Sequence, residues 1–236
     1  MLIASFPAGP LQTNCYVVAA EPGADCVIID PGMGAGGSVD QVVTEQQLRP
    51  VAILLTHGHI DHVFAVEELA ARHDIPVYIN DADRPMLSLG FDQLGMSELI
   101  EVCRHYSGGA DGLTEPADVR SLPTSGTHTY AGLDITHHHA PGHTPGCTLL
   151  ELPFPDAGPQ LDRVIFSGDV LFAGSIGRTD LPGGDPAVMG RTLRDVILGL
   201  PDTAAVLSGH GGQTTIGRER ATNPYLAGPN LQENMS

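Results

Sequence analysis

Lysine and tryptophan are absent from this chain of 236 residues, and all of its basic side chains are arginine. Eleven basic residues stand against 28 acidic ones, which gives a formal net charge of −17. A protein that follows a phosphate backbone needs a basic stripe, and the sequence contains none. We therefore expect a small-molecule substrate and no nucleic-acid partner.

The sequence also lacks an apolar run of the roughly 18 residues that a membrane helix needs, so no membrane partner is expected. Residues 1–7 do not show the basic region and following apolar region of a signal peptide. No two of the four cysteines form a CxxC pair, and this scattered placement indicates buried thiols in a reducing compartment. These features together predict a cytoplasmic protein. They carry no prediction of its oligomeric state.

Short apolar runs alternate with segments of helical spacing along the chain. Strands are predicted at 15–19, 26–30, 51–55, 77–79, 133–137, 147–152, 163–167 and 204–207. Helices are predicted at 39–48, 63–72, 96–106 and 186–199, with Pro50 ending the first of them. Hydrophobic residues make up 42% of the chain, and no linker separates its halves. We expect one α/β domain over residues 1–236, with helices outside packed sheets. Residues 81–125 show the least regular pattern.

Four residues of metal-ligand type follow the buried strand 51–55 within six positions: His57, His59, Asp61 and His62. On an extended turn, residues two apart point the same way, so His57, His59 and Asp61 are expected to project together. One small ion cannot easily use all four side chains, but two adjacent ions can share them. Imidazole and carboxylate are ligands that zinc and iron prefer.

Three further residues of metal-ligand type occur downstream, each directly after a glycine: His143, Asp169 and His210. Glycine lets the backbone turn tightly, so that the next side chain can face a crowded site. A lone histidine at the end of a strand is more often structural or solvent-facing. Seven residues of metal-ligand type in these contexts favour a metal centre instead.

The pattern HxHxDH with a downstream histidine, aspartate and histidine resembles the metallo-β-lactamase superfamily. Within it, the chain looks most like the short glyoxalase II-like hydrolases. The resemblance extends over nearly the whole chain, including Asn14-Cys15-Tyr16, Asp30-Pro31-Gly32 and Asn223-Pro224-Tyr225. It implies an αββα sandwich with metals at one edge between the sheets.

By this resemblance the chain would bind two divalent metal ions, zinc in the first place, with iron or a mixed zinc–iron pair as alternatives. One ion would be held by His57, His59 and His143. The other would be held by Asp61, His62 and His210, and Asp169 would bridge both. The implied activity is hydrolysis of a thioester, such as an S-lactoyl thiol conjugate, by a hydroxide between the ions. Asp61 and Asp169 would be the catalytic carboxylates, with Asp61 a ligand rather than the general base.

For other residues near the motifs, a functional and a structural role are alternatives. Asp30 matches a family aspartate that supports the metal loop, although an Asp-Pro-Gly turn also explains it. Arg178 is the expected substrate contact, because the corresponding loop of relatives approaches the thiol portion; a structural ion pair is the alternative. His137, His138 and His139 alternate along a predicted strand, so they are not expected to share an ion.

The chain departs from the longer glyoxalase II enzymes in two ways. It ends 26 residues after His210, too early for the helical region that helps those enzymes bind glutathione, and it lacks the lysine that they use. The thiol carrier is therefore left open. A mono-iron persulfide dioxygenase of the same fold, using His57, His143 and Asp169, is the alternative function. A non-catalytic metal-binding module is a further alternative. The absence of an export signal disfavours a β-lactamase.

Overall fold

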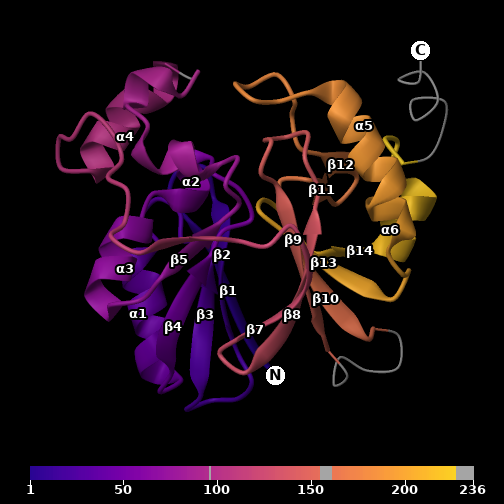
Figure 1. The fold of residues 1–236 in the computed structure, drawn as a ribbon, viewed down its shortest axis with the longest axis horizontal. Helices are drawn as coiled ribbons and strands as arrows, with labels where there is room; N and C mark the ends of the chain where they lie inside the picture. The colour runs from indigo at the N-terminus through magenta and orange to yellow at the C-terminus, as the bar shows by residue number, and fades with distance from the viewer. Residues whose placement is uncertain (96, 155–160, 227–236) are drawn as a thin grey trace.

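The computed structural model describes residues 1–95, 97–154 and 161–226 of the chain. Two six-stranded sheets pack face to face, and helices cover the outer face of each sheet (Figure 1). The predicted αββα sandwich is confirmed.

The first sheet comes from the N-terminal half of the chain. Its strands lie in the order β1 (Leu2–Ala8), β2 (Thr13–Ala19), β3 (Asp25–Ile29), β4 (Arg49–Leu54), β5 (Val77–Ile79) and β6 (Val119–Ser121). The pairs β1–β2 and β2–β3 are antiparallel, whereas β3 to β6 run parallel. Parallel strands are covered on both faces, which explains why β3 and β4 are continuous apolar runs.

The second sheet comes from the C-terminal half. Its strands lie in the order β14 (Thr214–Thr215), β13 (Ala204–Ser208), β10 (Arg163–Gly168), β9 (Thr148–Pro153), β8 (Leu133–His139) and β7 (Ser125–Tyr130). Among the described strands of this sheet, only β10 and β13 pair in parallel. A short antiparallel pair, β11 (Leu171–Phe172) and β12 (Ser175–Ile176), follows β10 and lies at the edge where the metal-ligand motifs occur.

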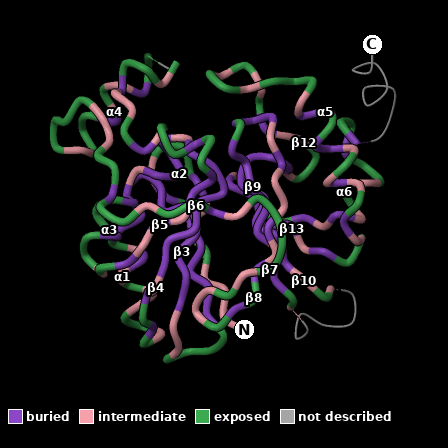
Figure 2. Tube along the Cα trace, in the orientation of Figure 1, coloured by how far each residue is buried: buried purple, intermediate pink, exposed green. Residues whose placement is uncertain are grey.

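Apolar side chains from the two sheets meet in a shared core. Val18, Ile29 and Leu54 of the first sheet belong to the same buried cluster as Leu150 and Phe166 of the second. The tube in Figure 2 shows these central strands as buried, with exposure rising toward the outer helices and loops. This core fixes the sheets against each other, and therefore fixes the loops at their common edge.

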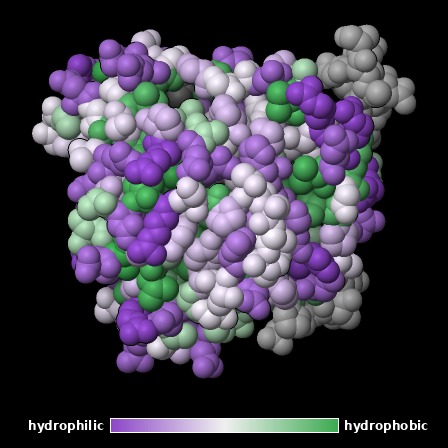
Figure 3. Space-filling model, viewed as in Figure 1, coloured by the Kyte–Doolittle hydropathy of each residue, from purple (hydrophilic) through white to green (hydrophobic). Residues whose placement is uncertain are grey.

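Helices complete the outer layers. α1 (Gly36–Glu45) and α3 (Val66–His73) bury Val39, Val66 and Leu69 against the first sheet. α5 (Pro186–Asp195) and α6 (Ile216–Thr222) cover the second sheet through a cluster that includes Met189 and Ile216. On the described part of the face in Figure 3, hydrophilic and hydrophobic side chains are intermingled and no single hydrophobic area covers it.

The segment between β5 and β6 forms a small structure of its own above the first sheet (Figure 1). It contains the short 3₁₀ helices η1 (Arg84–Ser88), η2 (Phe91–Gln93) and η3 (Ser97–Leu99), followed by α4 (Ile100–Tyr106). Phe91, Leu99 and Cys103 pack with Met33 and Ile60 in a separate buried cluster. The sequence pattern did not resolve this segment, because each of its elements is too short to show a period.

Several predicted boundaries were wrong. The helix predicted at 39–48 starts earlier, at Gly36, and ends at Glu45, because Gln47 adopts a positive φ of 55°. Pro50 therefore does not end the helix but lies inside β4.

The helix predicted at 63–72 is two helices, α2 (Ile60–Val63) and α3. Of the helix predicted at 96–106, Met96 lies outside the described residues, and α4 begins only at Ile100. The strands β1, β6, β7, β11, β12 and β14 and the helix α6 were not predicted.

Two other expectations can be compared with the structure. All four cysteines are buried and free of disulfides, as predicted. Among the described residues, no helix is long and apolar enough to cross a membrane.

Candidate metal centre

The seven predicted metal ligands lie at one edge of the sandwich, on loops and one short helix that follow the strand ends. His57 and His59 lie just after β4, while Asp61 and His62 lie on α2. The remaining three come from loops of the second sheet: His143 between β8 and β9, Asp169 between β10 and β11, and His210 between β13 and β14. Two sheets that meet through a common core thus bring together residues from opposite ends of the chain.

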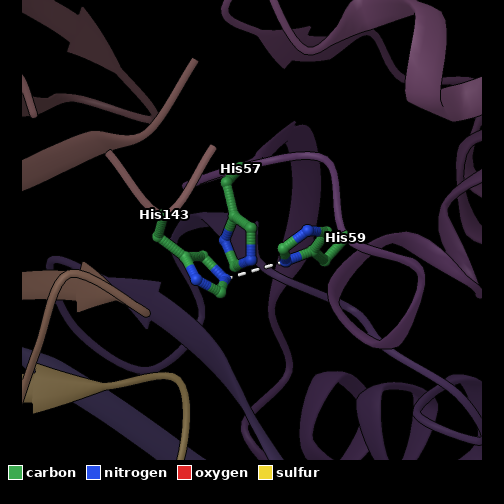
Figure 4. Close-up of side chains that lie close together, drawn as sticks. All are labelled: His57, His59 and His143. Atoms are coloured by element: carbon green, nitrogen blue, oxygen red, sulfur yellow. Dashed lines mark hydrogen bonds between the residues drawn. The ribbon is translucent and has the colours of Figure 1, made fainter. Parts of the chain in front are cut away.

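His57, His59 and His143 form a group that we call the three-histidine triad. One nitrogen of each lies within 4.8 Å of one nitrogen of each of the others. Figure 4 shows the three rings converging on one point, with His59 Nδ1 2.8 Å from His143 Nε2. His57 and His143 are buried and His59 is partly exposed. Three convergent imidazoles are a common ligand set for a divalent transition metal.

Asp61, His62 and His210 form a second group, which we call the Asp61 triad. His210 Nε2 lies 3.1 Å from Asp61 Oδ2, and His62 Nε2 lies 3.6 Å from the same oxygen. The rings of the two triads come close to each other, since the centroids of His57 and His62 are 4.1 Å apart. The two triads are therefore neighbouring sites.

Asp169 lies between the two triads. One of its carboxylate oxygens is 3.3 Å from His62 Nε2, and the other is 3.4 Å from His210 Nε2 and 3.6 Å from His143 Nε2. Gly209 makes this approach possible, because a Cβ there would lie 2.2 Å from Asp169 Oδ1 and 2.5 Å from His62 Cε1. A single carboxylate that touches both triads is placed as a bridging ligand would be.

Backbone carbonyls set the orientation of two of the imidazoles. His143 Nδ1 donates to the carbonyl of Arg178 at 2.7 Å, and His210 Nδ1 donates to the carbonyl of Leu11 at 3.1 Å. A carbonyl can only accept, so in each ring Nδ1 carries a proton and Nε2 is the nitrogen that faces the centre. Nε2 is therefore the nitrogen that each ring can offer to a metal ion.

The centre also contains buried polar atoms that make no hydrogen bond with the described residues: His57 Nε2, His62 Nε2 and Asp169 Oδ1. The last two contact each other as an ion pair at 3.3 Å. Buried polar atoms without hydrogen bonds are costly, and each needs an explanation. Inward-facing nitrogens and a carboxylate oxygen are the donor set for zinc or iron. The residues therefore fit two divalent cations.

The protonation of the two triads differs. Burial lowers the pKa of His57 well below its ordinary value and that of His59 to about 3, so the three-histidine triad is neutral. In the Asp61 triad, burial opposes protonation, but the nearby carboxylates outweigh it and raise the pKa of His210 to about 9. The pKa of Asp61 falls to about 2, because His62 and His210 outweigh its burial.

Asp30 supports both the strand end and the Asp61 triad. It is buried, adopts a positive φ of 49°, and accepts hydrogen bonds from Thr56 N at 2.8 Å and Thr56 Oγ1 at 2.5 Å. His62 Nδ1 lies 3.0 Å from Asp30 Oδ2, which leaves His62 Nε2 directed at the centre. A non-glycine residue held at positive φ costs free energy, and its three contacts explain why the conformation persists.

Asp83 is the corresponding support of the three-histidine triad, and the sequence interpretation missed it. It is fully buried and accepts from Gly58 N at 3.0 Å, from Thr144 Oγ1 at 2.6 Å and from Gly146 N at 2.7 Å. It therefore ties the loop of His57 and His59 to the loop of His143. No signal in the sequence singles it out, because it lies within the irregular stretch 81–125.

Three residues of β2 hold the Asp61 triad from the other side, and they were also not assigned a role from the sequence. Thr13 Oγ1 donates to Asp61 Oδ2 at 2.8 Å. Asn14 Nδ2 donates to the carbonyls of Ser208 and Gly211 at 2.9 and 3.1 Å, and Tyr16 OH donates to that of Ser208 at 2.6 Å. The Asn14-Cys15-Tyr16 motif could have indicated this supporting role. Its Asn14 and Tyr16 side chains hold the loop that carries His210.

The structure places Arg178 beside the centre through its backbone. Its side chain forms a two-point ion pair with Asp180, with both N–O distances 2.7 Å, while its carbonyl holds His143. The part of Arg178 that contacts the centre is thus its backbone. The guanidinium is exposed, and a substrate contact through it is a proposal.

His137, His138 and His139 belong to none of the possible metal-binding groups among the described residues. They point to different partners: the carbonyl of Pro123, the carboxylate of Glu151 and the carbonyl of Pro145. One geometric expectation was wrong, however. Asp61 does not project with His57 and His59 from an extended turn, because the chain enters α2 at Ile60 and turns Asp61 toward His62 and His210.

Comparison with known proteins gives the same fold and reaches nearly the whole chain. Residues 8–210 match the family model of the metallo-beta-lactamase superfamily. The hydroxyacylglutathione hydrolase GloC of Haemophilus influenzae is 31% identical over 227 residues, which are 96% of this chain and 98% of that protein.

Two crystal structures are closely similar in both fold and sequence. BLEG-1, a B3 metallo-beta-lactamase, gives a TM-score of 0.79 at 36% identity and covers 96% of this chain and 100% of its own. TTHA1623 in a di-iron-bound form gives a TM-score of 0.71 at 35% identity, with the same coverage. The αββα sandwich, the two triads at its edge and the match over residues 8–210 agree, and the chain belongs to the metallo-β-lactamase superfamily of metal-dependent hydrolases.

Proposed function

We propose that this protein is a two-metal hydrolase that cleaves a thioester of the S-lactoyl type. The observation that supports the two-metal site most directly is the position of Asp169, whose oxygens lie 3.3 to 3.6 Å from histidines of both triads. Two bound divalent ions would supply a nucleophile derived from water at neutral pH and would polarise the substrate carbonyl. GloC, a hydroxyacylglutathione hydrolase, supports the choice of a thioester.

The residues of the chain have defined tasks in this reaction. The buried histidines present lone pairs toward the centre, and Asp169 sets the spacing of the two sites. Asp61 accepts from Thr13 Oγ1, so it serves as an oriented ligand rather than as a free general base. No side chain has to protonate the leaving group, because a thiolate is stable near neutral pH.

The metal identity forms part of the proposal. Zinc suits both triads, and the mixed histidine and carboxylate ligands also suit iron. The similarity to a protein in a di-iron-bound form supports two ions per chain and keeps iron as an alternative. Elemental analysis of the purified protein, followed by removal of metal and reloading with each ion, tests this part.

The decisive experiment pairs metal content with a substrate panel. The panel contains S-lactoyl thioesters of several thiols, lactones, a persulfide and a cephalosporin. We expect about two metals per chain and thiol release from the thioesters, which is lost on chelation and restored by metal. One iron per chain with oxygen uptake on the persulfide would contradict the proposal.

β-Lactam hydrolysis is the second candidate, and a specific observation favours it. BLEG-1, described as a B3 metallo-beta-lactamase, is 36% identical to this chain over 96% of its length. The cephalosporin in the panel separates the two activities. Turnover of the cephalosporin that exceeds turnover of every thioester would replace the thioester with a β-lactam as the substrate.

A further inference from the structure

A buried polar pair, Glu219 and Asn223, lies on the second-sheet side of the metal centre. Both side chains are fully buried, with an exposed fraction of 0%. Glu219 belongs to α6, which contacts β13 and β14 (Figure 1), and Asn223 directly follows that helix. Asn223 Nδ2 donates to Glu219 Oε2 at 2.8 Å. A buried carboxyl group is costly unless it is hydrogen-bonded, so its partners indicate what it holds in place.

The pair holds the β11–β12 hairpin by its backbone. Gly174, in the turn of the hairpin, donates its N–H to Glu219 Oε2 at 2.7 Å. Asn223 Nδ2 donates to the carbonyl of Ser175 at 3.0 Å and lies 3.5 Å from that of Phe172. The hairpin is therefore fixed at its turn and at both of its strands.

Glu219 also holds the strand that follows His210. Its Oε1 accepts from Thr214 Oγ1 at 2.5 Å. Thr214 begins β14, and the loop between β13 and β14 carries His210. The ring of His210 in turn lies against the ring of Phe172 in the hairpin, with the two centroids 6.2 Å apart. One carboxyl group thus ties the His210 loop to the hairpin.

Both ends of the hairpin belong to the metal centre. Asp169 lies just before β11, and Gly177 and Arg178 lie just after β12. The carbonyl of Arg178 accepts from His143 Nδ1 at 2.7 Å. A Cβ on Gly177 would come within 1.8 Å of the Asp169 carbonyl oxygen and 3.1 Å of His143 Nδ1. These segments are so closely packed that a shift of the hairpin would move Asp169 and His143 together.

We infer that Glu219 and Asn223 are positioning residues for the three metal ligands that come from the second sheet: His143, Asp169 and His210. The pair acts through the hairpin and β14, whose backbone leads to or holds all three ligands. Asn223 is the first residue of the Asn223-Pro224-Tyr225 motif, which thereby has a defined task. The inference rests on the two-metal site of the proposed function and not on the choice of substrate.

The test is titration of the metal-free protein with Co²⁺, followed by the absorption of the bound ion. Glu219→Ala removes three hydrogen bonds, so we expect Co²⁺ affinity to fall about 10-fold or more, the lower end of the range for residues that orient metal ligands. The loss should be larger at the Asp61 triad, which depends on both Asp169 and His210. Asn223→Ala should act in the same direction.

Glu219→Gln should restore most of the affinity. The amide keeps an oxygen for Gly174 and Asn223, and its NH₂ group faces Thr214 Oγ1, which can also accept a hydrogen bond. We expect Co²⁺ affinity within about 3-fold of the unaltered protein, since the hydrogen bonds are kept. Thr214→Val removes only one of the three bonds and is the milder variant if Glu219→Ala does not fold; it should lower affinity mainly at the Asp61 triad.

Arg220→Ala is the matched control, because Arg220 lies next to Glu219 on α6. It donates to the carbonyls of Leu198 and Leu200 and to the carboxylate of Asp202, so its contacts lie at the segment after α5 rather than at the hairpin. We expect Arg220→Ala to lower the unfolding temperature of the metal-free protein and to leave Co²⁺ affinity unchanged.

Three results would overturn the positioning role. The first is Co²⁺ affinity that stays unchanged in Glu219→Ala and Asn223→Ala. The second is a loss in Arg220→Ala that equals the loss in Glu219→Ala, since affinity would then follow the stability of α6 alone. The third is a Glu219→Gln variant as weak as Glu219→Ala, because the hydrogen bonds would then not be what holds the ligands.

The titration needs no substrate, and this separates the inference from the proposed function. If no thioester is cleaved but Glu219→Ala lowers Co²⁺ affinity and Glu219→Gln restores it, the positioning role stands and the proposed function fails. If thioesters are cleaved but Co²⁺ affinity is the same in Glu219→Ala as in the unaltered protein, the positioning role fails and the proposed function stands.

Discussion

The two triads of the metal centre are built alike but differ in charge. Each combines residues that follow β4 with one residue from a loop of the second sheet, His143 in the three-histidine triad and His210 in the Asp61 triad. The first triad is uncharged, since burial lowers the pKa of His57 and His59. The second contains a carboxylate, and its histidines have raised pKa values.

The residues behind the ligands divide only in part. Asp83 ties together the two loops of the three-histidine triad, whereas Asp30 orients His62 of the Asp61 triad. Asp30 also reaches the three-histidine triad, because Thr56 Oγ1, which donates to Asp30, lies 3.1 Å from His57 Nδ1. The comparison teaches that Asp83 supports one triad, whereas Asp30 and Asp169 act on both.

Asp169→Ala should have the largest effect, because it removes the one group that both sites share. We expect metal content to fall from about two per chain to one or less. Turnover should fall by more than the 10- to 100-fold that is typical of residues behind the ligands. Elemental analysis and thioester assays measure both. The control is Asp162→Ala, which removes an exposed aspartate paired with Arg163. Full turnover in Asp169→Ala would refute the mechanism.

His143→Ala and His210→Ala remove one ligand from each triad. We expect about one metal per chain in both variants and a loss of turnover of at least about 100-fold in both, because the reaction uses both sites. Metal content and thioester assays on the two variants measure this. The mono-iron alternative makes a different prediction, since its iron would need His143 but not His210. Retained turnover in His210→Ala alone, with one iron per chain, would therefore favour the dioxygenase.

Asp83→Asn should weaken one site, whereas Asp30→Asn should weaken both. The amide that replaces the carboxylate presents N–H groups to N–H and O–H donors, so hydrogen bonds that the aspartate accepts are lost. We expect metal affinity to fall about 10- to 100-fold at the three-histidine triad alone for Asp83→Asn. For Asp30→Asn we expect a loss at both triads, because Asp30 contacts His62 directly and His57 through Thr56. Titration with Co²⁺, followed by absorption spectra, distinguishes the two sites. Equal weakening of both sites by Asp83→Asn would contradict this prediction.

Arg178→Ala should have the smallest effect. The carbonyl of Arg178, not its side chain, holds His143, so we expect two metals per chain and an unchanged kcat. If the guanidinium contacts an anionic thiol portion, KM should rise by roughly 3- to 10-fold, in the range of about 1 kcal/mol for an exposed charge. Asp180→Ala is the matched control, since it frees the guanidinium. An unchanged KM in Arg178→Ala would remove Arg178 as a substrate contact.

Much of the fold could be predicted from local sequence, and the failures have physical causes. The apolar runs of β3, β4 and β10 are continuous because both faces of these strands are buried. β7 is mostly exposed and carries no such run, so its sequence gave no signal. The end of α1 depended on the positive φ of Gln47, which no residue-type preference indicates strongly.

The sequence by itself determined the chemistry of the centre. The spacing of His57, His59, Asp61 and His62 is local, and glycine marks the three remaining ligands, so residue types alone indicated a two-metal site. What only the tertiary structure decided is which groups stand behind these ligands. Asp83 and Thr144 meet across 61 positions, and Asn14 reaches Ser208 across 194. Such contacts depend on how the two sheets pack, and packing follows from the whole buried core rather than from any segment.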